Sequence, residues 1–554
     1  MKWKILGKLK PQKSEKQKRQ KIIDLLLENR GLKSKKEIEE FLNPKKPQDL
    51  TFKDVGIKSL EVKKAIQRIK KAIKNQEKII VYGDYDTDGI CGTAILWETL
   101  YHLKADVLPF IPRREEGYGL RIEKLEQMAQ DGVKLIITVD QGIVQYQQAE
   151  RAHKLGLDLI ITDHHTLGEK KPKALAIVHT TQLAGCGVAW FLAKQLQGKT
   201  GLDLVTIGTI TDIVPLFGPN RSLVKYGLRE VQKSKRPALQ ALYDFAGLNK
   251  NKIGVFEISY LIGPRINAAG RMDDPMESLR LLCTPNESRA ISLAQKIDQR
   301  NRERQVLTER LTNHARGLWL AQDKNNCLIF ISHESYQDGV IGLVAGKLVE
   351  EFYRPAIVIA EGKEVSKASA RSINEFNIIE AVRSCASLLG PHGGHPKAAG
   401  FSLQTEKIQI FKEKILKIAQ EKLKDQELTP TLRVDMELDL SDVDLAFYRG
   451  LVSLEPFGEG NPQPVFLSRG LKIVDAKTVG AEKQHLKLRL GCSGTLSNFE
   501  AIGFGLGRLF NELSPQDRID VAYQLMVDEW NGHQRLQLKM KDIKISSEKN
   551  ERKN

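Results

Sequence analysis

The sequence predicts a multidomain α/β protein whose C-terminal part is a small β-barrel. Short β-branched runs alternate with stretches of helical composition in the first half of the chain, as in domains with a buried parallel sheet. A proline-free stretch of helix formers over residues 290–320 separates these runs from a second set. After residue 430, apolar and polar residues alternate in several short segments, which is the pattern of strands in a small antiparallel barrel.

The first 78 residues carry most of the positive charge. They contain 24 Lys and Arg against 10 Asp and Glu, so they hold 14 of the net 17 positive charges. A basic block suits a polyanion, because each cation near a phosphate releases condensed counterions, but it also fits a solvated tail. We expect a disordered basic arm over residues 1–20 and a helical segment over residues 21–78, where apolar residues recur at helical spacing.

Several protein classes are disfavoured by what the sequence lacks. It has no apolar run of about 18 residues, which a membrane-spanning helix needs. The basic N-terminus has no apolar stretch of a secretory signal, so a cytoplasmic location is the default expectation. The six cysteines are scattered without a Cys-x-x-Cys pair, which favours neither a disulfide framework nor a zinc site.

Three predicted strands end at acidic residues. The strands cover residues 79–81, 135–139 and 159–161, and the acids that follow them are Asp84, Asp140 and Asp163. In open α/β sheets, ligands bind beyond the carboxyl ends of the strands. Because these ends meet at one edge of a parallel sheet, we expect one site there.

The residue types at this predicted site indicate a metal. Residues 83–89 (GDYDTDG) place three carboxylates two residues apart, and two histidines follow Asp163. Such a mixed oxygen and nitrogen ligand set suits Mn²⁺ or Mg²⁺ better than structural zinc. Two ions about 3.5–4 Å apart would balance the carboxylates and stabilise an in-line attack on phosphorus. A calcium loop is disfavoured, because the sequence lacks the glutamate that closes such a loop.

The motifs resemble those of a known superfamily. The segments GDYDTDG and TDHH are similar to the DHH phosphoesterases. The resemblance narrows to the bacterial RecJ family of single-stranded-DNA exonucleases through seven further stretches: EGYGL (116–120), VDQGI (139–143), GPRINAAGRM (263–272), QRNRERQ (299–305), GVIGLVAGKL (339–348), GGHPKAAGF (393–401) and LEPFGEGNPQPVF (454–466). It covers about residues 20–545.

The resemblance implies a domain order. A DHH domain with a parallel sheet is expected over residues 79–230, followed by a helical region and connector helix over residues 231–320. A DHHA1 α/β domain over residues 321–425 and an OB-fold barrel over residues 430–545 complete the fold, and a polar tail covers residues 546–554.

The resemblance also implies roles for single residues. The expected metal ligands are Asp84, Asp86, Asp140, His164 and Asp212. The expected catalytic residues are these five together with Asp88, His165 and His395.

A second group of residues is implied in binding the strand. Ser369, Arg371 and Arg113 form the expected pocket for a 5′ phosphate, with Arg113 preferred to the adjacent Arg114 by its spacing to EGYG. The other expected DNA contacts are Arg265, Asn267, Arg271, Gly393, Gly394 and His395. Simpler interpretations are surface ion pairs for the arginines, a helix cap for Asn267, and a plain turn for the two glycines.

The function that the resemblance implies is 5′-to-3′ digestion of single-stranded DNA, in DNA repair and recombination. The enzyme would release 5′ mononucleotides with the help of Mn²⁺ or Mg²⁺, and two ions are expected. It would act as a monomer, with a single-strand-binding protein and a repair helicase as partners. One alternative is another DHH phosphodiesterase that acts on short RNA or cyclic dinucleotides. The other is a non-catalytic DHH-like replication factor that binds DNA.

Two positions depart from the expected motifs. Tyr82 stands where a histidine commonly precedes the first Gly-Asp, and Gln141 stands where asparagine is usual. If that histidine helps to hold the second ion, Asp84 or water must replace it here, and the second metal site is weaker.

Overall fold

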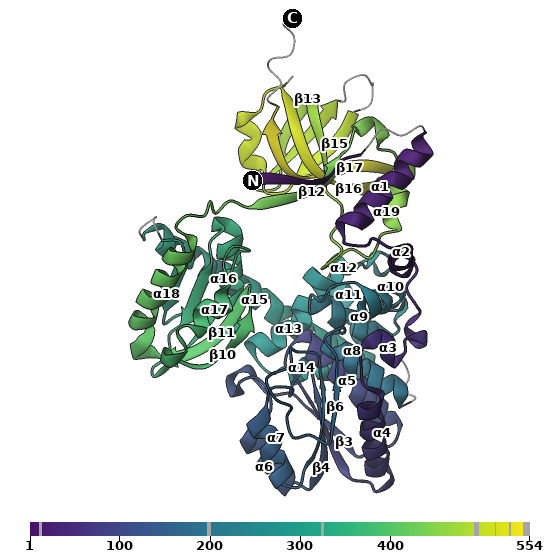
Figure 1. The fold of residues 1–554 in the computed structure, drawn as a ribbon, viewed down its shortest axis with the longest axis vertical. Helices are drawn as coiled ribbons and strands as arrows, with labels where there is room; N and C mark the ends of the chain where they lie inside the picture. Colours follow the sequence, from purple (N-terminus) through teal and green to yellow (C-terminus); the bar gives the residue numbers. More distant parts are fainter. Residues whose placement is uncertain are drawn as a thin grey trace, which may run out of the picture. The chain divides into compact units, whose positions relative to one another are not determined.

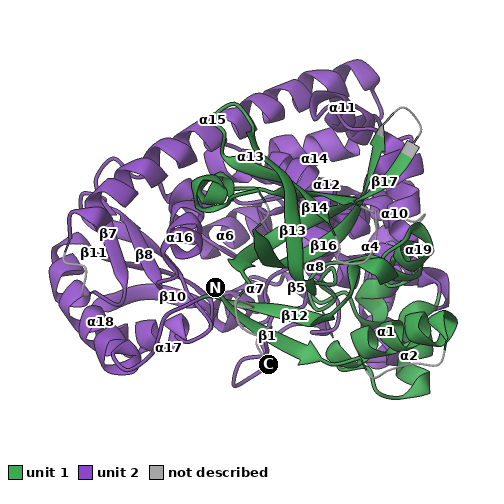
Figure 2. Cartoon of the chain, turned by 90° about the horizontal axis from the view of Figure 1, so that it is seen from above, with its two compact units in different colours: residues 1–45, 215–221, 430–554 green, residues 46–214, 222–429 purple. Residues whose placement is uncertain are grey.

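The chain folds into two compact units (Figures 1 and 2). The computed structural model describes residues 1–9, 14–196, 201–322, 326–491, 498–515, 517–530 and 533–546. Unit 1 comprises residues 1–45, 215–221 and 430–554, and unit 2 comprises residues 46–214 and 222–429. Among the described residues, no helix is both long and apolar enough to cross a membrane.

Unit 2 contains the predicted parallel sheet. Its strand order is β3-β2-β4-β5-β6, and every neighbouring pair is parallel. The strands are β2 (Lys78–Gly83), β3 (Val107–Phe110), β4 (Val133–Val139), β5 (Asp158–Asp163) and β6 (Ala176–His179). The three acid-terminated strands are therefore adjacent in the order β2, β4, β5, which brings their carboxyl ends together as predicted.

Helices surround this sheet and lead away from it. They are α3 (Phe52–Val55), α4 (Ser59–Lys74), α5 (Thr87–His102), α6 (Ile122–Gln130), α7 (Tyr146–Lys154), α8 (Gly185–Gln195) and α9 (Leu202–Thr211). The helical region that follows comprises α10 (Gly218–Lys233), α11 (Pro237–Phe245), α12 (Val255–Glu257), the π-helix η4 (Ile258–Ile262), α13 (Gly263–Met272) and α14 (Met276–Cys283). The predicted long helix is α15 (Glu287–Leu320), with 34 residues.

A second sheet of unit 2 has the order β10-β11-β9-β8-β7. Its strands are β7 (Ile329–His333), β8 (Ala356–Ala360), β9 (Val365–Arg371), β10 (Leu389–His395) and β11 (Ala398–Gln404), with only β7 and β8 parallel. The helices of this part are α16 (Asp338–Phe352), α17 (Ile378–Arg383) and α18 (Ile408–Leu423). The predicted second α/β domain is thus present.

Unit 1 contains the predicted barrel. Its strands are β12 (Thr431–Glu437), β13 (Phe466–Val479), β14 (His485–Gly491), β15 (Asn498–Gly503), β16 (Arg518–Trp530) and β17 (His533–Ile545). Strands β13, β14, β15, β17 and β16 pair in this order, and β16 pairs again with β13, so five strands close into a barrel. The β15–β17 pair is parallel, so the expectation of an antiparallel barrel is wrong at this pair of strands.

The expectation of a disordered arm over residues 1–20 is wrong for the described residues. Strand β1 (Lys2–Gly7) pairs in parallel with β12, and α1 (Glu15–Asn29) begins where the arm was expected to continue. The reason is the alternation of Trp3 and Ile5 with lysines, which places the apolar side chains against the barrel.

The helical segment expected over residues 21–78 is not one unit. Helices α1 and α2 (Lys35–Leu42) belong to unit 1, whereas α3 and α4 belong to unit 2. Ile22, Leu26 and Leu27 of α1 are buried with the barrel core, so the apolar stripe of this helix covers the barrel. The tail beyond Ser546 and Cys492 lie outside the described residues.

The LEPFGEGNP motif surrounds buried Arg221 in unit 1. This guanidinium donates to the carbonyls of Phe41, Leu454, Glu455 and Pro456 at 2.6–3.3 Å. Burial lowers the pKa of Arg221 to about 10. Because carbonyls satisfy the guanidinium, the motif has a structural role and joins the helix at Phe41 to the loop that precedes the barrel.

Candidate active site

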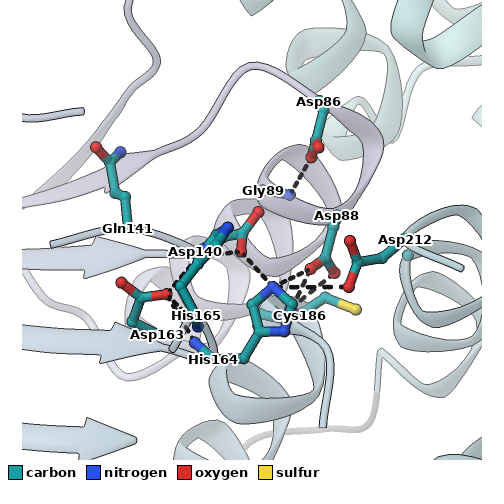
Figure 3. A network of polar contacts seen from close by, with 12 residues as sticks. Asp86, Asp88, Gly89, Asp140, Gln141, Asp163, His164, His165, Cys186 and Asp212 are labelled. Atoms are coloured by element: carbon teal, nitrogen blue, oxygen red, sulfur yellow. Dashed lines mark hydrogen bonds and ion pairs between the residues drawn. The ribbon is translucent and has the colours of Figure 1, made fainter. Parts of the chain in front are cut away.

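The carboxyl ends of the three central strands form a cluster of acids and histidines (Figure 3). Asp140 follows β4, and His164 follows β5. The His164 Nε2 atom lies 3.2 Å from Asp140 Oδ1 and 3.6 Å from Asp212 Oδ2. Asp212 comes from the C-terminal end of α9. Four separate segments, counting the β2–α5 turn, therefore supply the predicted metal ligands to one place.

The turn after β2 is shaped by its acids and its last glycine. Asp86 is the N-cap of α5, and its Oδ1 accepts the amide hydrogen of Gly89 at 3.0 Å. A Cβ atom on Gly89 would lie 2.6 Å from the carbonyl oxygen of Asp84. Glycine is therefore required at position 89 so that the helix can begin directly against the first acid.

Asp88 has a structural role that the sequence did not reveal. Its two oxygens accept the amide hydrogens of Gly185 at 2.7 Å and Cys186 at 2.9 Å, at the N-terminus of α8. A carboxylate is stabilised there by free amides and by the helix dipole. Asp88 also lies 4.0 Å from His164. It consequently fixes α8 beside the cluster and also lies among the acids of the cluster.

Asp163 holds both histidines in position. Its Oδ1 accepts the backbone amide hydrogens of His164 at 2.7 Å and His165 at 3.1 Å, and it lies 2.8 Å from the His165 Nδ1. Hydrogen bonds from His165 lower the pKa of Asp163 although burial opposes this. The contact with Asp163 also raises the pKa of His165 against the effect of burial. Carboxylate–histidine pairs of this kind orient metal-binding imidazoles.

Two residues with a left-handed backbone conformation lie at the cluster. Asp140 has a φ of 62°, and Ile213, which directly follows Asp212, has a φ of 59°. A left-handed conformation is unusual for aspartate and a genuine outlier for a β-branched residue. Strain of this type is retained where the surrounding structure holds a functional geometry.

The carboxylates of the cluster are under strong electrostatic stress. Burial, followed by repulsion from neighbouring acids, raises the pKa values of Asp84, Asp140 and Asp212 well above the ordinary range. In the described part of the chain, one buried oxygen of each of these three residues has no hydrogen-bond donor. Buried, unsatisfied carboxylate oxygens are the ligands that a hard divalent cation requires.

Among the residues that the structure describes, three sets of ligand atoms lie close enough to hold a cation. They are Asp84, Asp86 and Asp140; Asp140, His164 and His165; and Asp88, His164 and Asp212, with all atoms of a set within 4.8 Å of one another. The sets share Asp140 and His164, so they adjoin. The residues therefore fit one divalent cation and leave ligands for a second beside it.

The substitution at Tyr82 has a structural explanation. Its ring is fully buried in the core of the sheet domain, with its centroid 4.8 Å from that of Phe110. Its hydroxyl donates to the carbonyl of Gly119 at 3.3 Å. The buried Gln141 donates to the Tyr82 carbonyl at 3.3 Å. The two unusual residues thus contact each other in the core.

A second charged group in unit 2 consists of the half-buried arginines Arg114, Arg271, Arg304 and Arg371. Partial burial, together with Arg114, Arg304 and Arg371, lowers the pKa of Arg271 to about 10. Partial burial also lowers the pKa of Arg371 and of Arg304. Arg114 and Arg271 line a cleft of about 430 Å³ between α13 and α16, together with acids that include Asp273 and Asp338. Guanidiniums in such a group are suited to contacts with an anion.

Ser369 and Arg371, which are expected to bind a 5′ phosphate, lie side by side on β9. Arg371 Nη1 donates to Ser369 Oγ at 3.2 Å and to the Ala370 carbonyl at 2.8 Å. A Cβ atom on Gly342 of α16 would lie 2.9 Å from Ser369 Oγ and 3.1 Å from Arg371 Nη2. Gly342, the second glycine of the GVIGLVAGKL motif, therefore leaves room for Ser369 and Arg371.

The two candidate arginines before EGYG point to different partners. Arg113 is 57% exposed, and its guanidinium lies 3.9 Å from Asp274. Arg114 donates to the Gly270 carbonyl at 3.2 Å and lies 4.4 Å above the ring of Tyr85. Arg114 is thus within the arginine group, and Arg113 lies at its solvent-exposed edge.

The remaining predicted contacts occupy different environments. Arg265 is bound to Asp298 of α15 at 2.9 Å. Asn267 accepts the amide hydrogen of Thr87 at 2.8 Å, as the cap interpretation predicted. Gly393, Gly394 and His395 are exposed on β10. Gly394 has a φ of 145°, and a Cβ atom there would lie 2.2 Å from the Ala398 carbonyl oxygen, so this position requires glycine.

Several residues of the site were missed by sequence reasoning. Asp163 was noted as a strand end but not as a positioning residue. Tyr118 of EGYGL donates to the Asp140 carbonyl at 3.2 Å. Arg304 of QRNRERQ has a buried Nε without an acceptor among the described residues. The motifs contained these residues, but only the fold shows which member of each motif faces the site.

Comparison with known proteins supports the same domain order. Residues 78–209 match the model of the DHH family N-terminal domain, residues 324–424 the DHHA1 domain, and residues 434–542 the RecJ OB domain. Together with the strand-end cluster, these matches define a phosphoesterase of the DHH class.

Relatives narrow the class to one family. The chain is 36% identical over 540 residues to the single-stranded-DNA-specific exonuclease RecJ of Bacillus subtilis, covering 95% of this chain and 68% of the relative. It is 34% identical to RecJ of Thermus thermophilus, covering 87% and 71%. The crystal structure of that Thermus protein with Mn²⁺ matches with a TM-score of 0.81 at 30% identity, covering 98% of this chain and 79% of the other. The chain belongs to the RecJ family.

Proposed function

We propose that this protein is a metal-dependent exonuclease that digests single-stranded DNA from the 5′ end and releases 5′ mononucleotides. The observation that carries the proposal is the pair of charged groups in unit 2: a cluster of carboxylates and histidines that fits cations, and a group of half-buried arginines that fits an anion. The relatives named as single-stranded-DNA-specific exonucleases support the choice of substrate.

The proposed ligands are Asp84, Asp86, Asp140, His164 and Asp212, with Mn²⁺ or Mg²⁺ at one or two adjoining positions. A bound cation supplies charge stabilisation at the phosphoryl oxygens and lowers the pKa of a water molecule that attacks phosphorus. Asp163 orients the two histidines, and Asp88 fixes α8 beside them. His165, at the edge of the cluster with a raised pKa, is placed to donate a hydrogen bond to a phosphate oxygen.

The arginine group gives the proposed polarity. Ser369, Arg371 and Arg113 bind the 5′ phosphate, and Arg265 and Arg271 line the path of the strand. Arg371 offers a guanidinium beside a hydroxyl, the donor pair that a phosphate monoester accepts. His395 and the two glycines before it face the strand from β10. After each cleavage, the new 5′ phosphate replaces the previous one in the pocket.

The two alternative functions have less support. A phosphodiesterase for short RNA or cyclic dinucleotides does not need the barrel that matches the RecJ OB domain. A non-catalytic replication factor has no use for three carboxylates that each leave one buried oxygen without a hydrogen-bond donor in the described part of the chain. Single-strand-binding protein and helicase partners, a monomeric state, a cytoplasmic location and a role in repair and recombination are part of the same proposal.

The test compares strands labelled at either end. Purified protein with Mn²⁺ is expected to release labelled mononucleotides early from a 5′-labelled single strand and late from a 3′-labelled one. A duplex of the same sequence is the control and is expected to persist. Early release from the 3′ end contradicts the proposed polarity, and digestion that stops once strands exceed a few nucleotides favours the short-RNA alternative.

A further inference from the structure

An exposed aromatic pair lies in the helical region of unit 2. Phe256 of α12 is 58% exposed, and Tyr260 of η4 is 66% exposed. Their ring centroids are 4.9 Å apart, with the planes tilted by 33°. Single exposed apolar residues are common on protein surfaces. Two neighbouring aromatic side chains that are both exposed are suited to binding a ligand, because burying either ring would be favourable.

The backbone at this pair is irregular for an identifiable reason. Pro264 has no amide hydrogen for the carbonyl of Tyr260, and a proline ring crowds the carbonyl four residues before it. The chain forms the π-helix Ile258–Ile262 instead, in which the Gly263 amide hydrogen bonds to the Ile258 carbonyl. Single π turns inside α-helices are frequent at functional sites.

The C-terminal end of this π-helix contacts two segments of the carboxylate cluster. Thr87, between Asp86 and Asp88, donates its hydroxyl to the Gly263 carbonyl at 3.2 Å. A Cβ atom on Gly263 would lie 2.3 Å from Cγ2 of Thr211, the residue before Asp212. Tyr260 is therefore about one helical turn from Gly263, which contacts Thr87 and Thr211 beside the cluster.

Arg265 follows the pair in the next helical turn. It donates from Nη1 to the carbonyl of Leu261 at 2.7 Å, and its Nε atom is bound to Asp298 at 2.9 Å. A cationic side chain near the strand and aromatic rings for its bases are the two elements of single-strand binding sites. Stacking suits an enzyme that must accept every base in turn, because each base offers a π face whatever its sequence.

We propose that Phe256 and Tyr260 form a stacking platform for an unpaired nucleobase of the single strand, a few nucleotides from the bond that is cut. This inference rests on the proposed function for its ligand. The platform holds the strand by its bases while Arg265 contacts its phosphates, so it contributes to binding and has no part in the chemical step.

The test measures binding without cleavage. Single-stranded oligothymidylate with a fluorescent end is titrated with protein in the presence of EDTA. The double variant F256A/Y260A is expected to raise Kd by about 5- to 150-fold, the range for losing one stacked base. Phe256→Trp is expected to retain affinity. F256L/Y260L keeps apolar volume without a π face and is expected to bind as weakly as the alanine variant. Tyr101→Ala removes another exposed aromatic of unit 2 and serves as the matched control.

A strand with one abasic nucleotide locates the stacked base. Moving the abasic position along the strand is expected to weaken binding to the wild-type protein at one or two positions. The F256A/Y260A variant should be insensitive at those same positions. This coupling separates stacking from a general loss of affinity, because a structural defect would weaken all strands equally.

The outcomes distinguish this inference from the proposed function. Unchanged Kd values in F256A/Y260A, with a wild type that digests single strands, overturn the platform alone and leave the pair as a contact for another protein. A wild type that binds strands but does not cut them overturns the exonuclease, while the abasic coupling still decides on the platform. A wild type that neither binds nor cuts overturns both.

Discussion

Two charged groups of unit 2 are under opposite electrostatic stress. Burial and mutual repulsion raise the pKa values of Asp84, Asp140 and Asp212, whereas burial and neighbouring guanidiniums lower the pKa of Arg271. Either arrangement destabilises the folded chain by itself. Such groups persist where a ligand of opposite charge binds. Under the proposed function, the cations and the phosphate of the substrate bind at these two separate groups.

The largest expected effect tests the cluster of carboxylates. Asp140→Asn is expected to lower kcat at least about 100-fold, because changes to residues that only support metal ligands already cost 10- to 100-fold. The variant should keep its affinity for single strands. It should also lose most of the gain in Tm that Mn²⁺ gives the wild-type protein, since that gain reports binding to the native state.

A control separates the lost ligand from a general loss of charge. Asp131→Asn, at an exposed position after α6, is expected to change neither kcat nor the Mn²⁺-dependent gain in Tm. If Asp140→Asn retained cleavage, the acidic group would not be the site of the chemistry, and the comparison of the two groups would fail.

The next largest effect tests the group of arginines. Arg371→Ala is expected to weaken binding of 5′-phosphorylated strands by about 10- to 150-fold, which corresponds to one charge-assisted hydrogen-bonded contact of roughly 1.5–3 kcal/mol. Strands with a 5′ hydroxyl should bind almost as before. The measurement is Kd for the two kinds of strand in EDTA.

Adjacent arginines sharpen this result. Arg113→Ala is expected to reduce the preference for a 5′ phosphate, whereas Arg114→Ala should weaken both kinds of strand equally, because Arg114 is held against Tyr85 and Gly270. The reverse outcome would transfer the phosphate contact from Arg113 to Arg114.

A smaller effect concerns Asn267, which links α13 to the first residue of α5 beside the carboxylate cluster. Asn267 accepts the first amide hydrogen of α5, so Asn267→Ala is expected to destabilise the protein by about 1 kcal/mol, as for a lost helix cap. Denaturant unfolding measures this, and Kd for single strands should stay constant. Weaker binding at unchanged stability would return Asn267 to the DNA-contacting residues.

The smallest effect concerns Tyr82. Tyr82→Phe leaves the buried Gly119 carbonyl without its donor, which costs about 1 kcal/mol of stability. The Mn²⁺ concentration for half-maximal activity should not change, since the hydroxyl is engaged in the core. A shifted Mn²⁺ midpoint would instead mean that position 82 acts on the second ion.

Much of the site could be predicted because it depends on local rules. Parallel strands end at one edge, so acids after β2, β4 and β5 had to meet. Neighbouring side chains were harder to separate. Arg113 and Arg114 differ only in direction, and Asn267 can serve either as a cap or as a DNA contact. Such choices depend on packing from α13 and α16, which no sequence pattern shows.

The fold was least predictable at the chain's start. Lysine-rich composition outweighed the alternation of Trp3 and Ile5, and a strand of six residues gives a weak signal. Its pairing partner, β12, is remote in sequence. Likewise, the assignment of α2 and α4 to different units depends on tertiary contacts, because both helices have an apolar stripe of the same kind.

The pairing of β1 with β12 has a consequence for how the protein is made. Lys2 pairs with Thr431, so at about 5–20 residues per second the first strand waits on the order of tens of seconds for its partner. In the sequence, unit 2 comes between these two strands, so its residues are all made before β12. During synthesis, the apolar stripe of α1 has no barrel to cover until the strands after residue 430 are made. Residues 2–7 are thus made before unit 2 but find their pairing partner only after it.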